Sequence, residues 1–273
     1  VEDFLAVQAQ RIQQRRHRQL ALPVDPGVDD ALLVDLELEP GAAGRHQVRD
    51  EDLLVAVLGL HQIGARGADQ LRHDDALGAA RLGDTSQLTG LLERGIDPNT
   101  VDAQGNSLLI LAAREGQLDT VAALLKYRPK LDYRNLAGDS ALMLAVLRGH
   151  DTVAQALLKA GAAVNHDGWA PLHYAAFEGR EGMLDALFAA GADVNALAPN
   201  KATALMLAAR NGHIGVVRRL LALPQIDLNA LNDTGLSADA FALQNKNTDI
   251  AELIAAERKR RGLRPPAMKV TID

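Results

Sequence analysis

The sequence predicts a mainly α-helical solenoid, a stack of six helix-turn-helix units joined by short hairpin loops. The first observation is a repeat: glycines recur at intervals of 33, 33, 30 and 33 residues, at Gly83, Gly116, Gly149, Gly179 and Gly212. The second is that each glycine follows an Ala-rich apolar stretch and precedes another apolar segment. A fixed period of this size means that one small supersecondary unit has been copied, and that neighbouring copies bury each other's apolar faces. On this period the units span residues 74–101, 102–134, 135–166, 167–197, 198–231 and 232–262.

Polar caps mark the start of the first helix in each unit. A hydroxyl side chain, which accepts a hydrogen bond from the first helical turn, stands there at Ser107, Ser140, Thr203 and Ser237. Ala170 occupies this position in the fourth unit, and Pro171 follows it where the missing N–H of proline costs nothing. In the first unit we expect Asp74 or Asp75 to cap a helix from Ala76 to Leu82.

The second helix of each unit supplies the other half of the predicted core. Its apolar residues recur every three or four positions and so share one helix face. They are Leu88, Leu91 and Leu92; Val121, Leu124 and Leu125; Val153, Leu157 and Leu158; Leu184, Leu187 and Phe188; Val217, Leu220 and Leu221; and Ile250, Leu253 and Ile254. The repeated glycine is expected just past the end of each first helix, in a left-handed conformation. Lys246 replaces it in the last unit, so we expect a looser helix end there.

The fourth unit carries the most recognisable segment. Residues 170–176 read A-P-L-H-Y-A-A, and residues 191–195 read G-A-D-V-N. With the period of 33, these segments resemble the ankyrin repeat and its T-P-L-H-x-A signature. The chain is therefore identified as a member of the ankyrin-repeat family, of a divergent bacterial type. The resemblance implies a non-enzymatic solenoid with a concave face built from hairpin tips and first helices.

No residue pattern argues for an enzyme, a cofactor, a metal or a small-molecule substrate. There is no G-x-S-x-G elbow, phosphate loop or dinucleotide fingerprint, and the eight histidines form no metal-ligand motif. The resemblance implies that His173 makes a structural hydrogen bond between neighbouring loops. It also implies that Asp132, Asp193 and Asp227 are structural residues of the loop after the second helix.

The composition of the chain bears on its bonding chemistry, its localisation and its partners. The chain has no cysteine, which excludes disulfides and thiolate metal sites. No apolar run reaches the ~18 residues of a membrane span. As written the N-terminus has no export signal, so we expect a cytoplasmic protein, or a periplasmic one if the native N-terminus carries a signal as in similar bacterial proteins. The net charge is −6 overall, but residues 76–273 hold 21 basic and 21 acidic side chains, so nothing global draws the repeats toward nucleic acid. We expect a monomer.

Residues 1–73 differ from the repeats, because they contain no Ser, Thr, Asn or Lys. We predict a poorly ordered extension, or one weakly structured against the first repeat. Since Val1 stands where a Met would start translation, a spurious upstream extension is the other hypothesis. The predicted domains are thus this extension over 1–73, the repeat domain over 74–262 and a tail over 263–273.

The predicted function is binding of another protein through the concave face. In the family, partner contacts come from hairpin tips and from two positions late in the first helix. Carried over to this chain, the helix positions are Arg81, Leu82, Arg114, Glu115, Leu147, Arg148, Phe177, Glu178, Arg210 and Asn211, and the tips are Gln104, Asn106, Asp139, Trp169 and Leu236. The hairpin between Asn165 and Trp169 is three residues short, which predicts a notch beside Trp169. The alternative is that Trp169 plugs the gap.

Two other functions stay open. One is an accessory factor that supports an enzyme of the cell envelope. The other is RNA binding through the basic end, Arg258, Lys259, Arg260, Arg261 and Arg264, although cations at a helix C-terminus also interact favourably with the helix dipole. A catalytic domain within residues 1–73 fails on size and content.

Overall fold

The structure, a computed structural model, describes residue 70 and residues 72–266. The chain divides into two units, Val1–Leu53 and Leu54–Asp273, and every described residue lies in the second unit. The predicted extension therefore lies outside the described residues, except for residues 70, 72 and 73. The three domain boundaries stay predictions.

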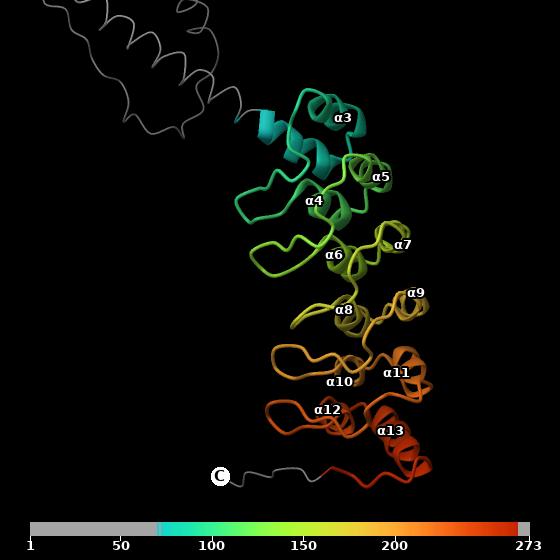
Figure 1. The fold of residues 1–273 in the computed structure, drawn as a ribbon. Coiled ribbons are helices and arrows are strands. Elements are labelled where there is room, and N and C mark those ends of the chain that lie inside the picture. The colour runs from blue at the N-terminus through green and yellow to red at the C-terminus, as the bar shows by residue number, and fades with distance from the viewer. Residues whose placement is uncertain (1–69, 71, 267–273) are drawn as a thin grey trace, which may run out of the picture. The chain divides into compact units, whose positions relative to one another are not determined.

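The described residues form six pairs of helices (Figure 1). Helical residues 72–82 pair with α3 (Thr85–Glu93). The next pairs are α4 (Leu108–Arg114) with α5 (Leu118–Lys126), and α6 (Ala141–Arg148) with α7 (Asp151–Lys159). They are followed by α8 (Pro171–Glu178) with η1 (Glu181–Met183) and α9 (Leu184–Ala189), α10 (Ala204–Asn211) with α11 (Ile214–Leu221), and α12 (Ala238–Gln244) with α13 (Thr248–Arg260). Apart from one isolated bridge between Val101 and Ser107, no strand pairing occurs in this part of the chain, so the mainly α solenoid is confirmed.

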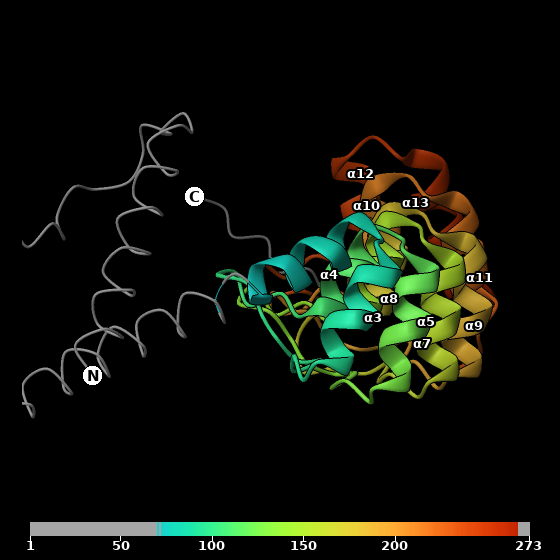
Figure 2. The same cartoon turned by 90° about the horizontal axis from the view of Figure 1, so that it is seen from above.

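The helices form two layers (Figure 1, Figure 2). The first helices α4, α6, α8, α10 and α12 stack on one another, and α5, α7, α9, α11 and α13 form the second layer. Hairpin loops project from the side of the first helices (Figure 1). The core lies between the layers, and alanines of the Ala-rich stretches, such as Ala175 and Ala176, are fully buried in it. Among the predicted second-helix residues only Leu125, Leu158, Phe188 and Leu253 are half-buried, because they lie at the edge of the apolar face.

The capping prediction holds for three of the four hydroxyls. Ser107, Ser140 and Thr203 accept hydrogen bonds from the backbone N–H three residues on, at 3.2, 3.3 and 3.3 Å. Ser237 does not, because its hydroxyl donates instead to Asp239 Oδ1 at 2.6 Å. The predicted aspartate cap is also wrong: residue 70 and residues 72–82 are helical, so Asp74 and Asp75 lie inside the helix.

The repeated glycines are left-handed, as predicted, with φ between +68° at Gly179 and +78° at Gly83 and Gly212. Lys246 takes the same conformation with φ +65°. Each glycine also has a second reason to lack a side chain, because a polar residue of the next repeat lies against it. A Cβ at Gly149, for example, would lie 2.7 Å from Arg180 Nη1.

These covering residues tie each repeat to the one before it. The guanidinium of Arg180 donates to the carbonyl oxygen of Leu147 at 3.0 Å, and His213 Nε2 contacts that of Phe177 at 2.9 Å. His150 Nε2 and the carbonyl oxygen of Arg114 lie 3.1 Å apart in the same way. The C-terminal carbonyl groups of the first helices are thereby satisfied by the following repeat.

Candidate protein-binding surface

The predicted helix positions lie at the C-terminal ends of the first helices, where α4, α6, α8 and α10 finish side by side. Phe177 at the end of α8 is 39% exposed and is the aromatic member of the eight exposed large apolar residues in the described part of the chain. Leu147 at the end of α6 is half-buried, and Glu178 is exposed, 3.8 Å from Arg180. The ends of consecutive repeats therefore bring apolar and charged side chains onto one surface.

Two arginines on this surface have no polar partner among the described residues. Arg148 and Arg210 are exposed, and neither side chain makes a hydrogen bond or ion pair within that part of the chain. They come from the repeats on either side of α8, so they flank Phe177. Arg114 is different, because its Nε lies 2.9 Å from Glu115 Oε1 and the two charges offset each other.

Two predicted contact residues are already used inside the fold. The side-chain amide of Asn211 donates to the carbonyl oxygen of Phe177 at 2.7 Å and so joins α10 to α8. Asn106 is only 5% exposed and donates to Asp102 Oδ2 at 2.9 Å while accepting from Asn135 at 2.8 Å. The expectation that Asn106 presents its side chain at a hairpin tip is therefore wrong, since its amide closes the turn.

Trp169 packs inward against its own repeat. Its ring lies 5.7 Å from the His173 ring and 5.9 Å from the Tyr174 ring, measured between centroids, and it contacts the apolar core. The Tyr174 hydroxyl donates to Asp139 Oδ1 at 2.5 Å, and burial together with this acceptor raises the pKa of Tyr174 well above its usual value. These contacts support the alternative in which Trp169 fills space left by the short hairpin.

His173 has the structural role that the resemblance implied. Its Nδ1 accepts from the backbone N–H of Ala170 at 3.0 Å, and its Nε2 lies 2.9 Å from the carbonyl oxygen of Ala196 in the next loop. Burial, the largest effect, lowers the pKa of His173, which favours the neutral ring that can accept at Nδ1. His173 thus satisfies the backbone N–H of Ala170 and links two loops, while no side chain takes the place of the hydroxyl cap at Ala170.

A groove of about 620 Å³ lies at the short hairpin. In Figure 1 the loop before α8 reaches less far than the loops before α6 and α10. The predicted notch is therefore present, but Trp169 does not line it, because the indole turns toward His173 and Tyr174. The lining residues are Arg134, Asn165, His166, Asp167, Gly168, Asp193, Ala196 and Leu197. His166 Nε2 is buried there without a hydrogen-bond partner, and burial lowers the pKa of His166.

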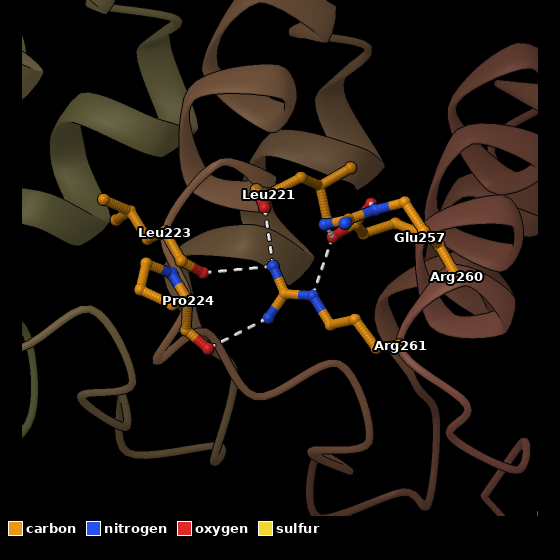
Figure 3. Close-up of polar contacts among 6 residues, drawn as sticks. All are labelled: Leu221, Leu223, Pro224, Glu257, Arg260 and Arg261. Carbon is orange, nitrogen blue, oxygen red and sulfur yellow. Dashed lines mark hydrogen bonds and ion pairs between the residues drawn. The ribbon is translucent and has the colours of Figure 1, made fainter.

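Most side chains of the basic end make hydrogen bonds to residues of the last two repeats, as Figure 3 shows for Arg260 and Arg261. Arg261 donates to the carbonyl oxygens of Leu221, Leu223 and Pro224 at 2.7, 3.1 and 3.0 Å, and it also donates to Glu257. Hydrogen bonds from Arg260 and Arg261 lower the pKa of Glu257 to about 2. Of the five cations predicted to form an RNA-binding cluster, only Lys259 and Arg264 make no polar contact within the described residues.

Arg258 is the member whose role the sequence did not reveal. It is 3% exposed and donates twice to Asp239, at 2.9 Å each, once to Asn229 Oδ1 at 3.1 Å and once to the carbonyl oxygen of Leu228 at 2.8 Å. In earlier repeats the backbone N–H of the next loop donates to the residue equivalent to Asn229, as Asp227 does to Asn195 at 2.8 Å. Arg258 therefore ends this series of loop contacts where no further loop follows. The available signal was Asp239, which stands where the other first helices carry Leu109, Leu142, Leu172 and Leu205.

Residue 70 and residues 72–266 contain neither a group of metal-ligating side chains nor a membrane-spanning helix. No cluster of three or more potential ligand side chains is placed to hold a metal ion. None of the helices in this part of the chain has the length and apolarity needed to cross a membrane.

Comparisons with known proteins identify the repeat. Residues 76–167, 129–198 and 172–262 match the family described as Ankyrin repeats (3 copies). The chain is 28% identical over 194 residues to human transient receptor potential cation channel subfamily A member 1, covering 67% of this chain and 17% of that protein. It is 32% identical over 146 residues to L-asparaginase of Dirofilaria immitis, covering 52% of this chain and 25% of that protein. The chain thus spans a quarter or less of either relative.

The repeats of this chain align with almost the whole length of one chain in a solved structure. A chain from the complex of the Bd0816 predatory endopeptidase of Bdellovibrio bacteriovorus with the immunity protein Bd3460 aligns with a TM-score of 0.60 and 29% identity. The alignment includes 67% of this chain and 97% of that one.

Proposed function

This chain belongs to the ankyrin-repeat family, and we propose that it binds another protein through the ends of its first helices, with the fourth repeat at the centre. Ankyrin repeats generally mediate protein–protein interactions. The observation that carries the proposal is the 39% exposure of Phe177 at the end of α8, together with two arginines unpaired within the described residues, Arg148 and Arg210, near the ends of the adjacent helices α6 and α10. Aromatic and Arg side chains are the types enriched at binding hot spots.

The proposed footprint is Leu147, Arg148, Phe177, Glu178 and Arg210. Full burial of a Phe side chain contributes about 1.5–3 kcal/mol, and Phe177 is 39% exposed, so a partner that covers it would recover roughly 1 kcal/mol. The two arginines would favour a partner segment with carboxylates beside an apolar residue, since an Arg fork binds carboxylate in a bidentate way. Arg114 and Glu115, which pair with each other, lie at the edge of this footprint.

We place Trp169 and Asn211 behind the footprint rather than in it. Trp169 supports Tyr174 and His173, and the Asn211 amide holds α10 against the end of α8. Their replacement would act on binding indirectly, by moving Phe177.

The proposed role is binding rather than catalysis. The buried histidine of the repeat signature, His173, uses both ring nitrogens in structural hydrogen bonds. The loop aspartates Asp193 and Asp227 accept from the backbone N–H two residues on, at 2.9 and 2.8 Å. These groups have structural partners, which supports the non-enzymatic proposal.

A second candidate is a protein that binds and restrains an enzyme. It is favoured by the similarity to a chain from the complex of an endopeptidase with an immunity protein, because 97% of that chain aligns at 29% identity. It shares an enzyme partner with the accessory factor considered in the sequence analysis, but that factor would support an envelope enzyme, whereas this candidate would restrain its partner. It specifies the partner class, a hydrolase, while the footprint stays the same.

Affinity capture with lysate, followed by mass spectrometry, should identify a partner, whose affinity is then measured by calorimetry. We expect Phe177→Ala to weaken binding by about 2 kcal/mol or more, as a hot-spot truncation does. Gln155→Ala, on the exposed side of α7, is the matched control and should leave the affinity unchanged. If Phe177→Ala, Arg148→Ala and Arg210→Ala all bind like the parent chain, the proposed surface is wrong. Assay of a captured hydrolase with and without the protein separates the two candidates.

A further inference from the structure

Two bonds among the described residues join an Asp or Asn to a following glycine: Asp167–Gly168 and Asn211–Gly212. In such a pair the glycine nitrogen can attack the side-chain carbonyl carbon, because glycine has no side chain to hinder the approach. The product is a five-membered succinimide ring. In an unfolded chain Asn–Gly reacts faster than Asp–Gly, since ammonia leaves a neutral amide more readily than water leaves a carboxylate. The sequence alone therefore points to Asn211.

The fold blocks reaction at Asn211. Asn211 is the last residue of α10, and its side-chain amide is held by the carbonyl oxygen of Phe177 at 2.7 Å. The backbone N–H of Gly212 donates to the carbonyl oxygen of Ala208. Ring closure would break both hydrogen bonds and turn the end of the helix.

The fold leaves Asp167 free to react. In the full-length hairpins the N–H of the equivalent glycine donates back to a carbonyl oxygen three residues earlier, at 2.9 Å for Gly105, 2.9 Å for Gly138 and 3.1 Å for Gly235. The N–H of Gly168 makes no hydrogen bond within the described residues, because the residues that would supply the acceptor are missing from this hairpin. Asp167 is exposed, and its backbone is held only through its carbonyl oxygen, by Arg134 Nη1 at 3.2 Å.

We propose that Asp167–Gly168 is a site of spontaneous isoaspartate formation, and that the native fold makes it react ahead of Asn211–Gly212. The Asp167 carboxyl reacts in its protonated form: the Gly168 nitrogen forms a bond to Asp167 Cγ, the bond from Cγ to the carboxyl hydroxyl group breaks, and this hydroxyl leaves with the Gly168 amide proton as water. Water then opens the ring at the bond between the Gly168 nitrogen and the original main-chain carbonyl carbon of Asp167. That carbon becomes a free carboxylate, and the chain continues through Cβ and Cγ.

The modification would change the groove at the short hairpin, which both residues line. The chain gains one methylene at its shortest loop, and the carbonyl group that accepts from Arg134 becomes a carboxylate. A loop shortened by three residues has little slack, so the walls of the groove must move.

The test compares the native full-length chain with the same chain unfolded in guanidinium chloride, both aged at neutral pH and physiological temperature. Peptide mapping by liquid chromatography and mass spectrometry then quantifies isoaspartate at each position. We expect several-fold more at 167 than at 211 in the native chain, and the reverse order in the unfolded chain. Asp167→Glu keeps the charge but would need a six-membered ring, so its signal at 167 should vanish. Equal or greater reaction at 211 in the native chain, or none at 167, would overturn the proposal.

Discussion

Replacing Arg258 with alanine should destabilise the C-terminal repeat more than any other change at the basic end. Arg258 is 3% exposed and makes four hydrogen bonds, two of them to the carboxylate of Asp239. Arg258→Ala removes all four and leaves Asp239, whose side chain is 24% exposed, without its counter-charge. Breaking a buried ion pair from one side costs about 3–5 kcal/mol. Because Asp239 retains some contact with water, we expect the lower end, about 3 kcal/mol.

The same contact predicts a pH dependence. Hydrogen bonds from Arg258 and Ser237, together with the charge of Arg258, outweigh burial and lower the pKa of Asp239 to about 2. In the unfolded chain the pKa is about 3.9. The folded pKa is the lower one, so the stabilisation is complete above about pH 4 and is lost as the pH falls toward 2. At about 1.4 kcal/mol per pKa unit it amounts to roughly 2–3 kcal/mol. In Arg258→Ala most of this pH dependence should disappear, so the two proteins converge in acid.

Urea titration at pH 7 and at several values down to pH 2, followed by circular dichroism, measures both effects. Since each repeat contacts only its neighbours, hydrogen exchange should place the loss in α12 and α13. Lys259→Ala, an exposed neighbour, is the control and should change stability by no more than ~0.5 kcal/mol. Replacing both Arg258 and Asp239 by apolar residues should recover part of the loss. A loss below that of Lys259→Ala, or one independent of pH, would refute the reasoning.

Four further predictions test the repeat and its ends. Gly149→Val should cost on the order of 1–3 kcal/mol, because φ is +75° and Arg180 leaves no space for a side chain; an unchanged urea midpoint would contradict this. Lys246→Gly should stabilise by up to ~1 kcal/mol by relieving a left-handed lysine, and a lower midpoint would count against it. Trp169→Ala should lower the thermal midpoint as well as binding, whereas loss of binding alone would return Trp169 to the footprint. Removal of residues 1–69 should shift the thermal midpoint by less than ~5 °C, and a larger fall would mean that the segment packs on the repeats.

The basic end also makes a prediction about RNA. With Arg258, Arg260 and Arg261 engaged, two cations of the basic end, Lys259 and Arg264, are left without a side-chain partner among the described residues. We expect no steep salt-dependent retardation of RNA, because few phosphate contacts release few counterions. Binding that falls strongly between low and physiological salt would restore the RNA hypothesis.

Most of the fold could be predicted because the same sequence signals recur in successive repeats. The period, the cap hydroxyls and the glycine positions are local signals, each of which depends on residues within one or two helical turns. Where a local signal failed, the reason was an unexpected neighbour. Ser237 stands at a cap position, but its hydroxyl donates to the carboxylate of Asp239. The predicted helix start at Asp74 or Asp75 was wrong, because the helix already includes residues before them. Nothing in the apolar pattern before Ala76 indicated that the helix extends that far.

The candidate surface was only partly predictable. The sequence alone determined which residues reach the ends of the first helices, because the helix period and the repeat place them there. Only the tertiary structure decided which of them are free to bind. The Asn211 amide donates a hydrogen bond to the carbonyl oxygen of Phe177, and Arg258 donates to Asp239 and Asn229. The side chains of Arg148 and Arg210 make no such contact within the described residues. The physical reason is that a polar side chain finds its hydrogen-bond partner in an adjacent repeat, tens of residues away, and no local pattern records that partner.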